Sequence, residues 1–177
     1  MVFKTILTAA LFLKLCFLYI FGNIAVLTPC LKGFVVKQMN RVASIVMPID
    51  DYWDSLFTWP MIQTLWKYGR YEIHKHSRVG KATPNTRLIS TDPAEQHVDG
   101  LHLLDLVKGS RPLVVVFGSC TCPVVIAKMA YIHEAQRDFA DVADFVFVYV
   151  QEAHPYDGWR MKVHIYIYIY IYEHTFG

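Results

Sequence analysis

Net charge is nearly absent from this chain. Its 177 residues include 17 lysines and arginines against 15 aspartates and glutamates, a formal net charge of +2. A nucleic-acid-binding protein carries a basic stripe, so this balance argues against that class. Cysteine is also scarce, and four residues are too few for a disulfide scaffold. Apolar residues make up 54% of the sequence, which excludes disorder of the whole chain. What remains is a small membrane-attached protein or a hydrophobic soluble one.

The amino-terminal segment favours the membrane-attached class. The run from Leu15 to Leu31 is uncharged and has about the minimum length for a helix that crosses the hydrocarbon core. Lys14 and Lys32 bracket this run and are placed to reach the two interfaces. A cleaved signal peptide is the competing interpretation, because Lys4 precedes an apolar stretch at 5–13. The apolar run continues past Lys14 without a small-residue cleavage pattern, so we expect an uncleaved single-pass anchor at 1–32.

Residues 33–84 combine aromatic and basic side chains. Trp and Tyr favour the membrane–water boundary, so the segment predicts a juxtamembrane linker with one or two helices lying along the headgroups. Nucleic-acid binding is the weaker alternative for this segment. His74 and His76 have no partner cluster, and we predict no metal site. The next segment contains a strand candidate at Thr86–Ser90 and an amphipathic stretch at Leu101–Val107 that ends near Gly109.

The strongest pattern lies between residues 112 and 150. Leu113–Phe117 is apolar at every position, which is typical of a strand buried on both faces. Pro123 suits the first turn of a helix, and apolar residues then recur at helical spacing as far as Phe139. Asp144–Val150 is a second apolar strand candidate. Strand, helix and strand in this order predict a βαβ unit with parallel strands and a right-handed crossover, and therefore an α/β fold.

Two cysteines occupy the loop between the first strand and the helix. Cys122 directly precedes Pro123, where unpaired N–H groups and the helix dipole favour a thiolate, the nucleophilic form of cysteine. Cys120 lies two residues earlier, so it is placed to attack an oxidised or substituted Cys122 and resolve it. The alternative is two loop cysteines without redox function.

The second strand is followed by polar residues at the same edge of the predicted sheet. Functional groups gather at the carboxyl ends of parallel strands, so we expect His154 to lie near Cys122. There the imidazole is a candidate to donate a proton or to stabilise a thiolate. Glu152 is a candidate to orient the imidazole. Taken alone, a histidine beside Pro and Gly is more often a surface residue.

The carboxyl-terminal residues 161–177 change character, because 165–172 read IYIYIYIY. This repeat resembles a translated dinucleotide repeat. It suggests the hypothesis of a truncated or mis-spliced product with a low-complexity tail. As a strand, the segment is an aggregation hazard.

The strings RPLVVVFGSCTCP (111–123) and DFVFVYVQEAHPYDGW (144–159) resemble the iodothyronine deiodinases. The resemblance extends weakly upstream to the anchor. It implies a membrane-anchored enzyme with a thioredoxin-like core, here incomplete, at 85–160. It also implies removal of iodide from thyroid hormones, with no bound cofactor and an external thiol as reductant. Its other implications are a homodimer and a location in the endoplasmic reticulum or plasma membrane. Lys32, Lys37 and Arg41 follow the apolar run, and the positive-inside rule slightly favours a cytosolic catalytic part.

The resemblance also assigns residues. Cys122 occupies the family's selenocysteine position and would attack iodine, and His154 would help to bind substrate and protonate the ring carbon. Glu152 matches a motif glutamate, and Cys120 the cysteine that supports regeneration. Three further residues match positions around the active site and are candidate substrate contacts: Ser119, Thr121 and Tyr149.

The chain departs from the family pattern in two ways. Sulfur replaces selenium, which predicts slower deiodination because a thiol is the poorer nucleophile and leaving group. The later family strands, with a further histidine and an arginine that contact substrate, are replaced by the Ile–Tyr repeat. Two other functions therefore stay open: a thiol peroxidase or thiol-disulfide oxidoreductase of the same fold, and an inactive truncated membrane protein.

Overall fold

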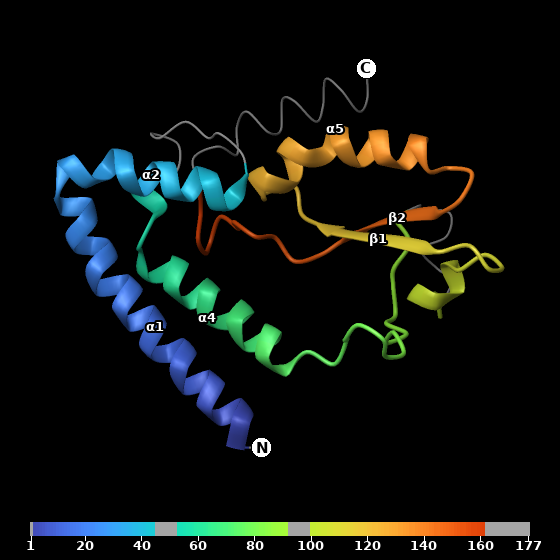
Figure 1. Cartoon of the computed structure of the whole chain (residues 1–177), viewed down its shortest axis with the longest axis horizontal. Helices are drawn as coiled ribbons and strands as arrows, with labels where there is room; N and C mark the ends of the chain where they lie inside the picture. Colours follow the sequence, from blue (N-terminus) through green and yellow to red (C-terminus); the bar gives the residue numbers. More distant parts are fainter. Residues whose placement is uncertain (1, 45–52, 92–99, 162–177) are drawn as a thin grey trace. The chain divides into compact units, whose positions relative to one another are not determined.

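The structure is a computed structural model that describes residues 2–44, 53–91 and 100–161. Most of the Ile–Tyr tail therefore lies outside the described residues. The elements in chain order are α1 (Val2–Leu27), α2 (Pro29–Ala43), a 3-10 turn (Trp53–Ser55), α4 (Trp59–His74), a second 3-10 turn (Leu103–Leu106), β1 (Leu113–Gly118), α5 (Pro123–Asp138) and β2 (Asp144–Tyr149) (Figure 1). The expected mixture of helices and strands is confirmed.

The chain divides into two compact units, and the division cuts through α5. The first unit contains the described residues of Met1–His74, Ser119–Lys128 and Gln151–Gly177. The second contains those of Lys75–Gly118 and Met129–Val150. The domain boundaries predicted from sequence stay a prediction.

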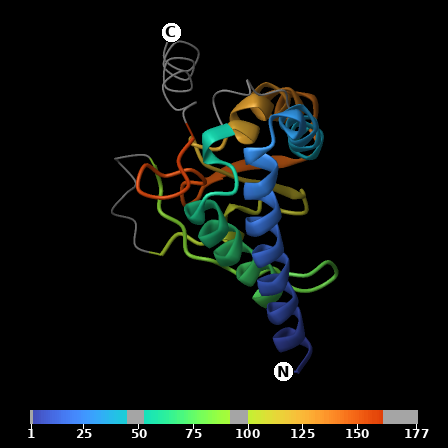
Figure 2. The same cartoon turned by 90° about the vertical axis from the view of Figure 1, so that its left-hand side faces the viewer.

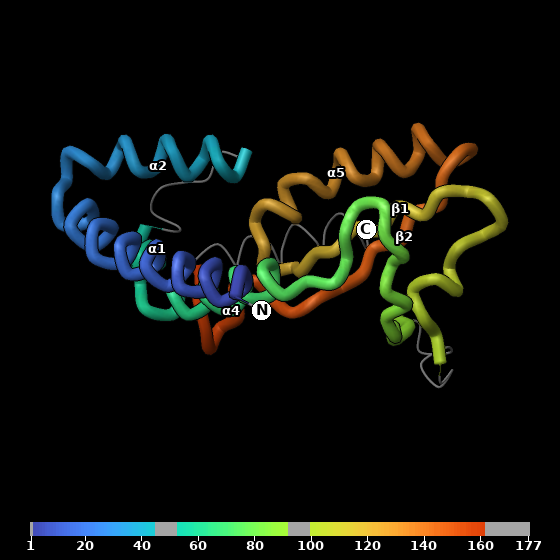
Figure 3. Tube along the Cα trace, turned by 60° about the horizontal axis from the view of Figure 1, so that its bottom comes forward, coloured from blue at the N-terminus to red at the C-terminus, as the bar shows by residue number. Residues whose placement is uncertain are grey.

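The apolar amino-terminal helix is longer than expected and ends earlier. α1 has 26 residues and is long and apolar enough to cross a membrane, by length and composition alone. It stops at Leu27, because Thr28 is extended (φ −109°, ψ 95°) and Pro29 opens α2. Proline lacks an N–H and clashes with the preceding helical turn, so one helix cannot continue smoothly through this point. The expectation of a single helix over 15–31 is therefore wrong, and Lys14 lies inside α1. The chain changes direction between α1 and α2 (Figure 3).

The core of the first unit forms where α4 runs beside α1 (Figure 2). Gly69 of α4 permits close approach, because a Cβ there would lie 2.6 Å from a methyl carbon of Leu11. Linker aromatics also pack on α1, with the Phe12 and Trp66 rings meeting edge to face at 6.1 Å. One cluster of buried residues in this unit contains Val36, Leu56, Phe57, Met61 and Met161.

The second unit is built on a parallel strand pair. β1 and β2 pair from Leu113 opposite Asp144 to Gly118 opposite Tyr149, which confirms the predicted strand–helix–strand unit. The strands are not buried on both faces, so that expectation is wrong. Each has only one partner among the described residues, and several large side chains stay exposed: Val114, Phe117, Phe147 and Tyr149.

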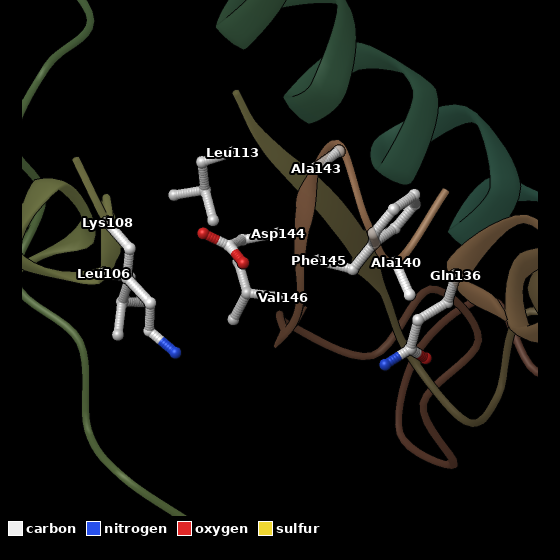
Figure 4. Close-up of a pocket in the computed structure, with 9 residues that line it drawn as sticks. All are labelled: Leu106, Lys108, Leu113, Gln136, Ala140, Ala143, Asp144, Phe145 and Val146. Carbon is white, nitrogen blue, oxygen red and sulfur yellow. The ribbon is translucent and has the colours of Figure 1, made fainter. Parts of the chain in front are cut away.

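Alternation along the strands sends side chains to opposite sides of the pair. Figure 4 shows Leu113, Asp144 and Val146 on the side of Leu106 and Lys108, in a cavity of about 320 Å³. Phe145 lies on the other side, with Gln136 of α5 and Ala140 just after that helix, and these three residues line the same cavity (Figure 4).

Arg111 fixes the start of the strand pair. Its guanidinium pairs with the Asp144 carboxylate at 3.3 Å and donates to three carbonyls of the loop before β2. The segment before Arg111 contains no strand among its described residues. The strand expected at Thr86–Ser90 is a single antiparallel bridge between Arg87 and His102. The predicted amphipathic stretch is a short 3-10 turn, and Gly109 follows it with φ +60°.

Candidate active site

The cysteine loop leads directly into α5. The Cys122 amide donates to the Ser119 carbonyl (3.3 Å), and the Cys122 carbonyl accepts from the Ile126 amide (3.1 Å). Cys122 therefore immediately precedes the helix, and Pro123 begins it, as predicted. The Cys122 residue is half-buried and Cys120 is exposed, and both are free cysteines.

Four hydrogen bonds join this loop to the loop that follows β2. The Ala153 amide donates to the Ser119 hydroxyl (3.2 Å), and the His154 amide donates to the Thr121 hydroxyl (3.0 Å). In the other direction, the Thr121 amide (3.0 Å) and hydroxyl both donate to the Glu152 carboxylate. The two loops that sequence reasoning expected at one sheet edge therefore lie together, and Thr121 contacts both partners.

His154 is a buried residue, with 6% of its surface exposed. Its Nδ1 lies 2.9 Å from the Trp159 carbonyl oxygen. A carbonyl only accepts, so Nδ1 carries a proton, and Nε2 holds the lone pair of the neutral ring. The Trp159 ring meets the imidazole edge to face at 4.6 Å and 72°.

Glu152 was expected to orient the imidazole. The structure places one of its carboxylate oxygens on Thr121, where it organises the cysteine loop. Orientation of His154 by Glu152 stays a prediction. Sequence reasoning gave no role to Trp159, although it ends the quoted 144–159 string.

The charge of Glu152 also reaches Cys120. Cys120 is an exposed residue, but partial burial of its thiol, and secondly the Glu152 carboxylate, raise the pKa of that thiol above its usual value. Both causes disfavour the thiolate, because one removes solvent and the other is a like charge. Cys120 is therefore held as a thiol to higher pH than an ordinary cysteine.

The remaining predicted residue, Tyr149, ends β2 with 48% of its surface exposed. Just beyond it, the Gln151 side chain accepts a hydrogen bond from the Lys67 ammonium of α4 (2.6 Å). Among the residues that the structure describes, no group of three or more His, Cys, Asp or Glu is placed to hold a metal ion.

These features define a class: an α/β protein with a thiol at the start of a helix and a buried histidine in the adjoining loop. An apolar helix long enough to cross a membrane precedes them in the chain. The family model described as iodothyronine deiodinase matches residues 2–174. The chain belongs to the iodothyronine deiodinase family.

Curated proteins that are similar to this chain carry the names of deiodinases. The thyroxine 5-deiodinase of Gallus gallus is 38% identical over 104 residues, which are 59% of this chain and 39% of that protein. The type II iodothyronine deiodinase of Neoceratodus forsteri is 34% identical over 115 residues, 60% of this chain and 43% of the relative. The type I enzyme of Xenopus laevis is 29% identical over 158 residues, 86% of this chain and 61% of the relative. The chain thus spans less than two thirds of these relatives' length. No solved structure matches it.

Proposed function

We propose that the chain is a thiol-dependent deiodinase that removes iodide reductively from an iodothyronine, on a thioredoxin-like core. Family membership and the names of the relatives supply the substrate class. The observation that carries the proposal is the hydrogen-bonded pair of loops, which holds the Cys122 loop against the segment of the buried His154.

The proposed chemical step starts from the Cys122 thiolate. Its sulfur attacks a ring iodine, so the S–I bond forms while the C–I bond breaks. The electron pair of the C–I bond stays on the ring carbon, which takes up a proton from the protonated His154. The products are the deiodinated ring and a sulfenyl iodide on Cys122.

Regeneration needs two thiols. The first, Cys120 or an external thiol, attacks the Cys122 sulfur, releasing iodide and a proton and forming a disulfide. An external thiol then reduces that disulfide and restores Cys122. The two electrons that reduce the C–I bond thus come from thiols, and no bound cofactor takes part.

We assign supporting roles to three residues. Ser119 and Thr121 use their hydroxyls within the paired loops, so we propose that they shape the wall against which the substrate binds. Tyr149 presents an exposed phenol at the end of β2 and is proposed to contact an iodothyronine ring.

We also propose that α1 anchors the protein in a membrane of the endoplasmic reticulum or cell surface, with the catalytic part in the cytosol. The apolar length of α1 and the basic residues that follow it support this arrangement. A homodimer is proposed from the family resemblance, and the exposed apolar side chains of the strand pair agree with it.

The test is iodide release from thyroxine by the full chain in detergent micelles with dithiothreitol. We expect slow turnover that Cys122→Ser abolishes and His154→Ala lowers by a factor of about 100 or more. Cys30→Ser is the matched control, because Cys30 is a free, exposed cysteine in α2, and it should retain the full rate. Peroxide consumption without iodide release would reject the deiodinase in favour of a thiol peroxidase. Absence of both activities would favour a non-catalytic protein.

A further inference from the structure

The contact that fixes the catalytic imidazole comes from a residue without an assigned role. A turn after His154, closed by a hydrogen bond from the Gly158 amide to the Pro155 carbonyl (3.1 Å), brings Trp159 back to the ring. The Trp159 carbonyl then accepts the Nδ1 proton, and its indole covers the imidazole edge to face. Residue 159 therefore sets both the tautomer and the orientation of the ring.

Trp159 is itself held by the amino-terminal part of the chain. Its indole N–H donates to the Ser55 carbonyl at 3.0 Å, and Ser55 is buried. The indole also packs against the buried core of the first unit, which contains the neighbouring Leu56 and Phe57. The position of the Trp159 carbonyl, which accepts the His154 Nδ1 proton, thus depends on the turn that precedes α4.

That turn is strained and is held from two sides. Phe57 has φ +56°, a left-handed conformation that bulky residues rarely adopt. Its amide contacts the Met61 sulfur (3.0 Å), and its carbonyl accepts from the Asn23 side chain of α1 (3.1 Å). The Phe57 ring occupies the space of a side chain at Gly22, where a Cβ would lie 2.2 Å from the ring. The turn is therefore locked onto α1.

We propose that Trp159 is a positioning residue, which fixes the His154 imidazole through its carbonyl and ties that imidazole, through its indole N–H, to the Phe57 turn and α1. The contribution of this link to the reaction rests on the proposed function of His154. On this proposal α1 helps to build the site, in addition to any anchoring.

The experiment reads the His154 ring directly. The full chain, with ¹⁵N-labelled histidine in detergent micelles, is studied by two-bond ¹H–¹⁵N correlation at a pH where the ring is neutral. The His154→Gln variant assigns the signals. We expect the Nδ1–H tautomer in the native chain and a mixture of tautomers in Trp159→Phe, which keeps an aromatic ring but lacks the N–H. Trp59→Phe is the matched control, because exposed Trp59 contacts the Tyr19 ring, and it should leave His154 unchanged.

A second variant tests the link at its far end. Gly22→Ala must displace the Phe57 ring, so we expect it to move the His154 signals although it lies in α1. Unchanged His154 signals in both variants, with native circular dichroism, would overturn the proposal. If Trp159→Phe fails to fold, the His154 signals of Gly22→Ala test the proposal, and unchanged signals in that variant overturn it.

The same samples also separate this proposal from the proposed function. Trp159→Phe should lower kcat about 10- to 100-fold and leave KM within about twofold. If the native chain releases no iodide, the proposed function is wrong. The tautomer of His154 is measured without turnover, so it still tests the positioning role of Trp159.

Discussion

Replacing Thr121 by valine removes one hydroxyl that takes part in two hydrogen bonds between the site loops. The shape of the side chain is nearly kept, but the Glu152 carboxylate loses a donor and the His154 amide loses its acceptor. The backbone bond from the Thr121 amide to Glu152 remains. The substitution therefore tests the contact between the loops and leaves their chain path intact.

The expected magnitude follows from the two lost bonds. A hydrogen bond to a charged group contributes about 1.5–3 kcal/mol, and an amide left without an acceptor costs about 1–3 kcal/mol. Partial exposure of Thr121 and Glu152 reduces both contributions, so we expect the local opening free energy to fall by about 3 kcal/mol. Each 1.4 kcal/mol is a factor of ten, so the His154 amide should exchange about a hundredfold faster.

Amide hydrogen exchange of a peptide containing residues 152–155 measures this change. Thr121→Ser keeps the hydroxyl and should exchange within a few-fold of the native chain. If Thr121→Val exchanges at the native rate, the hydroxyl does not hold the loops together, and our account of the site is wrong.

Other predictions follow from the same structure. Because the pKa of Cys120 is raised, its alkylation by iodoacetamide should increase only at higher pH than for an unperturbed cysteine. Glu152→Gln removes one cause and should move the midpoint to lower pH, and an unmoved midpoint contradicts this. Arg111→Ala removes an ion pair and three hydrogen bonds to carbonyls, so it should destabilise the strand pair by about 2 kcal/mol in urea unfolding. Pro29→Ala should let α1 and α2 straighten, which spin labels on the two helices would register as a longer distance.

Local patterns in the sequence predicted the parallel strand pair, the start of α5 and the placement of the loops. The strand at Leu113–Phe117 and the start of α5 at Pro123 are signalled by the local sequence, so both were predicted correctly. Parallel strands place their carboxyl ends at one edge, and this alone predicted that the loops of Cys122 and His154 would adjoin. The burial of the strands could not be read in this way, because it depends on which elements cover each face.

The contacts around His154 could not be predicted from the sequence. The bond from Trp159 to Ser55 joins an indole to a backbone carbonyl far along the chain, and any residue supplies such a carbonyl. A positive φ is uncommon for phenylalanine, so the sequence does not predict the turn at Phe57. The uncharged run Leu15–Leu31 also predicted the wrong end for the first helix, because Thr28 is extended and Pro29 begins a second helix within that run.

In the proposed mechanism Cys122 attacks iodine, and Cys120 is one of two candidates for the thiol that then attacks the Cys122 sulfur. Attack on iodine needs a thiolate, whereas Cys120 sits where burial and Glu152 oppose ionisation. The raised pKa lowers the thiolate fraction of Cys120 at neutral pH, which disfavours Cys120 as the nucleophile that attacks iodine. The same carboxylate accepts two hydrogen bonds from Thr121, whose hydroxyl holds the His154 amide. Neutralising Glu152 should therefore change both the reactivity of Cys120 and the attachment of the histidine loop. We expect Glu152→Gln to lower the pH midpoint of Cys120 alkylation and also to speed exchange of the His154 amide. A surface carboxylate without these contacts would change neither measurement.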